Sequence, residues 1–153
     1  MIKVQHEAFD IGAEIARLTE GRRDIGAIVT FTGTVRDQSG AVDQMSIEHY
    51  PGMTESELAK IEAEACARWP LQASLIVHRH GTLKAGDNIV LVVTASAHRD
   101  AAFDAARFLM DYLKSSAPFW KRESGKGGSR WVEASANDES AVASRTKPKH
   151  AAE

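Results

Sequence analysis

The chain has 153 residues, of which 43% are hydrophobic and 26% charged, a composition typical of one soluble globular domain with its own core. Its formal net charge of −2 argues against a protein that coats nucleic acid with basic charge. The single cysteine, Cys66, excludes an internal disulfide and a cysteine-rich zinc site. No apolar run is long enough for a membrane span, and the polar N-terminus is not typical of a signal peptide, so we expect a cytoplasmic protein.

Helices and strands follow one another irregularly, each indicated by hydrophobic spacing and by neighbouring capping or turn residues. In chain order, the first predicted elements are a helix between Asp10 and Gly21, strands over 25–36 and 42–50, and a helix that begins near Thr54 and ends before Pro70. They are followed by a strand over 71–79, a turn over 81–87, a strand over 88–97, a helix over 100–116, and a strand pair over 119–123 and 130–134. Only a short turn separates the first two strands, so we expect them to form a hairpin. The mixture lacks strict βαβ alternation, which favours the α+β class.

Two of the helices carry apolar residues on one face, which we expect to pack inward. Thr54 and Glu57 have the spacing of a capping box at the start of the first of these helices. The expected inward residues are Leu58, Ile61, Ala65 and Cys66 in that helix, and Phe103, Ala106, Met110 and Leu113 in the helix over 100–116. This placement makes Cys66 a buried core residue rather than a nucleophile.

The composition changes after residue 136. Residues 137–153 are rich in Ala, Ser, Lys and Glu and contain no aromatic residue. Such a segment cannot bury enough apolar surface to offset the entropy lost on ordering. We therefore predict one domain over 1–136 followed by a mobile polar C-terminal tail over 137–153.

Basic side chains gather towards the C-terminal end of this net acidic chain. From Lys114 to Arg130 there are five basic residues and one acid, Glu123, and such a cluster can bind phosphate or another anion. His98 and Arg99 lie where a buried strand gives way to a helix, and backbone N–H groups at a helix start also favour an anion. The alternative interpretation is that these are solvated surface charges.

Lys114 and Lys121 are the candidates for catalytic chemistry. Lys114 follows Met110 by one helical turn and so lies beside the apolar face, while Lys121 shares one side of its strand with Phe119. A lysine held against apolar surface can serve as acid, base or nucleophile; the alternative is a packed stem with the ammonium in water. Arg36 ends its strand, where a guanidinium is placed to bind an oxyanion.

Other chemistries have weaker support. His78 and His80 share one side of a strand, but no HExxH motif or carboxylate cluster accompanies them and His49 lies elsewhere, so we expect no metal. A histidine-based metal hydrolase is one alternative. Trp120 and Trp131 near basic residues leave RNA binding by base stacking as another, although core or dimer packing explains these two side chains better.

Seven blocks of the sequence, spread over residues 3–136, carry a resemblance to a known family. They are Gly26–Arg36, Glu48–Met53, His78–Leu83, Ser96–Arg99, Met110–Lys114, Ala117–Glu123 and Trp131–Glu133. In this order and with this spacing, the blocks resemble the large, catalytic subunit of the molybdopterin synthase family. Seven ordered blocks are far more specific than any single motif above.

The resemblance implies a fold, a reaction and partners. The fold would be of the α/β hammerhead type with an additional antiparallel sheet region. The activity would be that of a sulfurtransferase in molybdenum cofactor biosynthesis, which converts cyclic pyranopterin monophosphate to molybdopterin. Sulfur would arrive as a thiocarboxylate on the C-terminal Gly-Gly of a small ubiquitin-like sulfur-carrier subunit. The chain would form a homodimer within a heterotetramer, with no cofactor, metal, nucleic acid or membrane.

The resemblance also assigns roles to individual residues. The implied catalytic residues are Lys114 and Lys121; the substrate-binding residues are Arg36, His98, Arg99 and Lys121; and the carrier-tail pocket is lined by Phe31, Met110 and Lys114. One departure is Ser135, at a position where relatives can have an arginine that adds to the substrate pocket.

Overall fold

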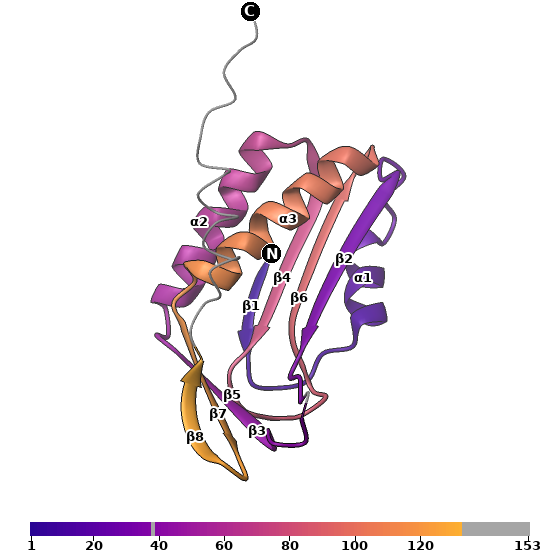
Figure 1. The fold of residues 1–153 in the computed structure, drawn as a ribbon. Helices are drawn as coiled ribbons and strands as arrows, with labels where there is room; N and C mark the ends of the chain where they lie inside the picture. Colours follow the sequence, from indigo (N-terminus) through magenta and orange to yellow (C-terminus); the bar gives the residue numbers. More distant parts are fainter. Residues whose placement is uncertain (38, 133–153) are drawn as a thin grey trace, which may run out of the picture.

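The structure is a computed structural model that describes residues 1–37 and 39–132, and those residues form two four-stranded sheets and three helices (Figure 1). The elements are β1 (Ile2–Gln5), α1 (Ile11–Thr19), β2 (Ala27–Thr34), β3 (Gln44–His49), α2 (Met53–Arg68), β4 (Leu71–Arg79), β5 (Gly81–Lys84), β6 (Asn88–Ser96), α3 (Arg99–Ser115), β7 (Phe119–Gly125) and β8 (Gly128–Val132). The expected α+β class is confirmed. The predicted tail over 137–153 and the departure at Ser135 lie outside the described residues.

The first sheet has the order β1-β4-β6-β2 and is covered on both faces. β1 runs parallel to β4, and the other neighbours are antiparallel. On one face, Ile76 and Val92 pack with α2 and α3; on the other, Leu75 and Val93 pack with α1. Figure 1 shows α1 on the opposite side of this sheet from α2 and α3. Two covered faces explain why residues 75–77 of β4 and 89–93 of β6 are consecutive apolar residues instead of alternating with polar ones.

The second sheet has the order β5-β3-β7-β8, is antiparallel throughout, and lies beyond one end of the first (Figure 1). It is the additional antiparallel region that the resemblance implied. Met45, Ile47 and Leu83 are buried on its inner face, whereas Trp120 and Trp131 are exposed. The predicted strand pair near the C-terminal end is confirmed as β7 and β8; β5 was missed because it is short and directly follows β4.

The expected hairpin between strands 25–36 and 42–50 is wrong. β2 pairs with β6 in the first sheet, while β3 pairs with β5 and β7 in the second. The connection between β2 and β3 does not form a tight turn, because its two ends bind different partners. Val35 N–H donates to the Asp87 carbonyl, and Asp43 N–H donates to the Ser124 carbonyl. Closeness in sequence therefore did not decide the pairing here.

The two helix starts differ in how well the sequence predicts them. The cap of α1 is confirmed, since the Asp10 carboxylate accepts from Ala13 N–H at 2.8 Å. The capping box of α2 is shifted from its predicted place. Gly52 is the N-cap, with a φ of 82°, and its N–H donates to the Glu55 carboxylate at 2.7 Å. The Thr54 hydroxyl is buried and donates to the Tyr50 carbonyl instead.

The inward faces of α2 and α3 differ from expectation at two positions. In α2, the expected aliphatic residues are buried, but Cys66 is exposed. In α3, Phe103 is 60% exposed and the buried stripe runs through Ala102, Ala105, Ala106, Leu109 and Leu113. The Thr94 hydroxyl on β6 donates to the Ala102 carbonyl at 2.6 Å. The start of α3 thus lies so close to the sheet that alanine fits there and phenylalanine turns outward.

Candidate functional site

Lys114 and Lys121 flank the corner where α3 passes into β7. Lys114 is exposed in the last turn of α3, one turn after the half-buried Met110, and Lys121 is half-buried on β7. The connection is tight, because the N–H groups of residues 116 and 117 both donate to the Tyr112 carbonyl. The structure therefore brings the two predicted catalytic lysines to the two sides of one short turn.

A buried histidine lies behind this corner. The His78 side chain is 2% exposed, and its ring stacks on Phe119 with centroids 3.7 Å apart and planes 15° apart. The pKa of His78 is lowered to about 3, mainly by burial and in part by the positive charges of Lys121, His49 and His80, while the hydrogen bond to the Arg79 carbonyl opposes this shift. Its Nδ1 lies 2.8 Å from the Arg79 carbonyl, which can only accept, so a neutral ring carries its hydrogen on Nδ1.

Further imidazoles gather at the same end of the first sheet. The His49 and His80 rings have centroids 4.4 Å apart, and His6 lies 6.3 Å from His80. Burial, and then the charges of His49 and His6, lower the pKa of His80. The sequence separated His49 from His78 and His80, and the structure brings its ring beside that of His80, which lies between β4 and β5. Across residues 1–37 and 39–132, no three His, Cys, Asp or Glu side chains form a group that could hold a metal ion.

Phe31 and Arg36 belong to β2 and to the residues just beyond it. Phe31 is 37% exposed and pairs with Val92, so it lies on the sheet face that α3 covers. A side chain at Gly33 would come within 2.8 Å of Val90 Cγ1, so this glycine leaves room for its cross-strand neighbour. Arg36 is exposed two residues after β2 ends.

His98 and Arg99 lie at the other end of α3. Both are exposed; His98 is the N-cap, and Arg99 is the first helical residue. Lys114 follows Arg99 by fifteen residues, about 22 Å along the axis at a rise of 1.5 Å per residue. Within one chain, the predicted substrate-binding residues His98 and Arg99 are therefore not brought to the lysine corner.

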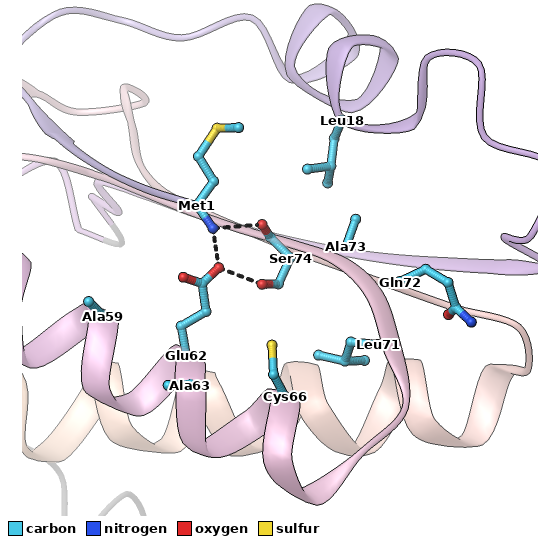
Figure 2. A pocket seen from close by; sticks show the side chains of 10 residues that line it. All are labelled: Met1, Leu18, Ala59, Glu62, Ala63, Cys66, Leu71, Gln72, Ala73 and Ser74. Atoms are coloured by element: carbon cyan, nitrogen blue, oxygen red, sulfur yellow. Dashed lines mark hydrogen bonds and ion pairs between the residues drawn. The ribbon is translucent and has the colours of Figure 1, made fainter.

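Two hollows elsewhere contain none of the predicted site residues. One, of about 410 Å³, lies between α2 and the start of β4, where the Met1 ammonium binds Glu62 and the Ser74 carbonyl (Figure 2). The other, of about 370 Å³, lies beside the β7–β8 turn, where the Arg130 guanidinium is 3.1 Å from the Glu123 carboxylate. The polar groups named in each hollow already bind one another.

The fold is that of a two-sheet α+β protein with one lysine on each side of the turn between α3 and β7. The family described as "MoaE protein" matches residues 4–116 of the chain. The chain therefore belongs to the MoaE protein family, which supports the resemblance seen in the sequence.

Named relatives agree with this assignment. The chain is 57% identical over 143 residues to the molybdopterin synthase catalytic subunit of Mesorhizobium japonicum, covering 92% of this chain and 90% of that protein. The structure of the molybdopterin biosynthesis MoaE protein from Burkholderia ambifaria has 49% sequence identity and a TM-score of 0.81, over 94% of this chain and 96% of the other. A complex of subunits 1 and 2 of the Helicobacter pylori molybdopterin-converting factor contains the same fold, with 19% identity and a TM-score of 0.73 over 86% of this chain and 90% of the other.

Within the described residues, no helix is long and apolar enough to cross a membrane.

The histidine behind the corner is the residue whose place sequence reasoning missed. His78 was considered only as a metal ligand. The signal that could have found it is a polar residue directly after the apolar residues 75–77 of β4, where a buried ring needs a specific partner.

Proposed function

We propose that this chain is the catalytic subunit of a molybdopterin synthase, which transfers sulfur to cyclic pyranopterin monophosphate and so makes the dithiolene of molybdopterin. Membership of the MoaE protein family supports the reaction. The observation that carries the site assignment is the α3–β7 corner, because Lys114 and Lys121 flank it. The proposed compartment is the cytoplasm.

The proposed sulfur donor is a small ubiquitin-like carrier subunit whose C-terminal Gly-Gly ends in a thiocarboxylate. The Helicobacter pylori complex, whose two subunits are named together, supports a partner of this kind. The thiocarboxylate and the substrate phosphate are both anions, so they favour the same cationic corner. Phe31 and Met110 would contact the apolar parts of the carrier tail, one from β2 and the other from α3.

The proposed chemistry uses the two lysines differently. The thiocarboxylate sulfur forms a bond to a side-chain carbon of the pterin while the C–O bond at that carbon breaks, and negative charge develops on the departing oxygen. Water then cleaves the acyl–sulfur bond, which leaves the sulfur on the pterin and the carrier terminus as a carboxylate. The Lys114 ammonium, nearer to the carrier terminus, stabilises that charge. Lys121 binds substrate and moves protons as a general acid and base. Arg36 would bind the substrate phosphate, for which a guanidinium is well suited.

The distance along α3 bears on how many chains form one site. His98 and Arg99 lie about 22 Å from Lys114 on the same helix, too far for one small substrate to contact both ends. In the proposed homodimer within a heterotetramer, a second copy would supply these two residues to the first copy's lysines. A single copy would then bind the carrier but lack part of the phosphate site.

The test is a pair of lysine variants. Lys114→Ala is expected to lower turnover at least about 100-fold, the usual contribution of a positioned acid, base or charge. Lys84→Ala, at an exposed position on β5, is the matched control and is expected to retain full turnover. Carrier binding by calorimetry should persist in both variants. Unchanged turnover in Lys114→Ala would refute the assignment of this residue.

A further inference from the structure

The strongest unassigned feature is the packing of His78, Phe119 and Arg79 behind the lysine corner. His78 is on β4 of the first sheet and Phe119 is the first residue of β7 in the second, so their stacked rings join the two sheets. The stack is close and nearly parallel, with centroids 3.7 Å apart. Aromatic pairs contribute packing that depends on ring orientation, beyond the area that they bury.

A hydrogen bond to the backbone also fixes the orientation of the His78 ring. Its Nδ1–H donates to the Arg79 carbonyl at 2.8 Å, which sets the plane of the imidazole. Arg79 is 8% exposed, and its guanidinium donates to the His6 carbonyl at 2.9 Å and to the Asn88 carbonyl at 3.1 Å. The backbone just after β1 and at the start of β6 therefore holds the Arg79 side chain. The Arg79 carbonyl in turn orients His78, and the His78 ring packs on Phe119.

Phe119 occupies the position from which β7 departs. It follows Lys114 by five residues and precedes Lys121 by two, so Phe119 and Lys121 share one side of the strand. The register to β3 pairs Phe119 with His49 and Lys121 with Ile47. A shift of the Phe119 ring would move this start of β7, and the Lys121 side chain would move with it.

We propose that His78 is a positioning residue: its ring, stacked on Phe119, sets the place of the Lys121 ammonium relative to Lys114. The role in turnover rests on the proposed function, whereas the placement of Lys121 does not. The imidazole suits this task because it presents a flat face to Phe119 and a hydrogen-bond donor to Arg79. Because it stays neutral, it adds no second positive charge beside the lysine.

Two variants separate the ring from the hydrogen bond. His78→Phe keeps a flat ring against Phe119 and loses the donor to Arg79; His78→Gln keeps an amide donor and loses the ring. We expect His78→Gln to lower kcat about tenfold with KM for carrier and pterin unchanged within about twofold, because misplacing a catalytic group lowers kcat. His78→Phe should retain kcat within about twofold of the native value.

A second readout needs no turnover. The purified proteins are acetylated with trace acetic anhydride, and the reaction at each lysine is measured by peptide mass spectrometry, with Lys84 as the internal reference. Loss of the stack loosens the start of β7, so acetylation of Lys121 should rise at least about threefold in His78→Gln and stay native in His78→Phe. Phe119→Leu removes the same stack from the other side and replaces His78→Gln if that variant does not fold.

The outcomes are distinct. Reduced kcat and raised Lys121 acetylation in His78→Gln or Phe119→Leu, with both native in His78→Phe, support the proposal. Native acetylation of Lys121 in His78→Gln and Phe119→Leu overturns it, as does full activity in His78→Gln together with low activity in His78→Phe. If no protein, native included, turns over substrate, the proposed function fails while the acetylation pattern still decides the placement of Lys121.

Discussion

The buried neutral His78 predicts a specific dependence of stability on pH. Burial lowers its pKa to about 3 in the folded protein, against an ordinary value of 6.5. When the pH falls through 6.5, the unfolded chain takes up a proton at this position and the folded chain does not. The contribution of His78 to the free energy of unfolding is therefore fully present above pH 6.5 and is lost as the pH falls towards 3. From pH 7 to pH 5, linkage gives a loss of about 2 kcal/mol from this one group.

The assay is urea unfolding of the native protein and of His78→Gln at both pH values. Glutamine does not titrate, and its amide can still donate to the Arg79 carbonyl. The other titratable groups are the same in both proteins, so their contributions largely cancel in the comparison. We expect the free energy of unfolding to fall by about 2 kcal/mol more in the native protein than in the variant between pH 7 and pH 5. Equal losses in the two proteins would refute a buried neutral His78.

Two further pairs of variants test the packing by urea unfolding. Gly125→Ala would place a Cβ 1.6 Å from the Ala41 carbonyl oxygen, so we expect the free energy of unfolding to fall by at least about 2 kcal/mol. At Gly127 a Cβ meets no described atom within 4 Å, so the free energy of unfolding of Gly127→Ala should stay within about 0.5 kcal/mol of the native value. Leu109→Ala removes a fully buried side chain and should cost about 2–5 kcal/mol, whereas Phe103→Ala, at a 60% exposed position, should cost less than about 1 kcal/mol. A larger loss of stability in Phe103→Ala than in Leu109→Ala would mean that Phe103 faces inward on α3, as the sequence predicted.

Most of the secondary structure could be predicted because its signals are local. The apolar run of β4 has the predicted bounds, and Asp10 caps α1 as expected. The pairing of β2 could not be predicted, because it depends on β6, which lies more than fifty residues away in sequence. In α3, Ala106 and Leu113 are buried as predicted, but Ala102 takes the inward place expected for Phe103, because an alanine gives no hydrophobic signal until its closeness to the sheet is known.

The lysine corner could be predicted in part. Lys114 and Lys121 were identified from their spacing beside apolar residues and from the family resemblance, and the structure places them at one turn. The stack of His78 on Phe119 joins two sheets, so no local pattern contains it. The separation of Arg99 from Lys114 follows from helix length alone. It bears on function because the family resemblance assigns both residues to one site.

Transfer of sulfur from the carrier to the pterin can be tested by one reconstitution. The purified chain is mixed with a thiocarboxylated carrier subunit and cyclic pyranopterin monophosphate, and molybdopterin is measured as its fluorescent oxidised derivative. We predict product only when all three components are present. A folded chain that binds the carrier and yet forms no molybdopterin would contradict the account.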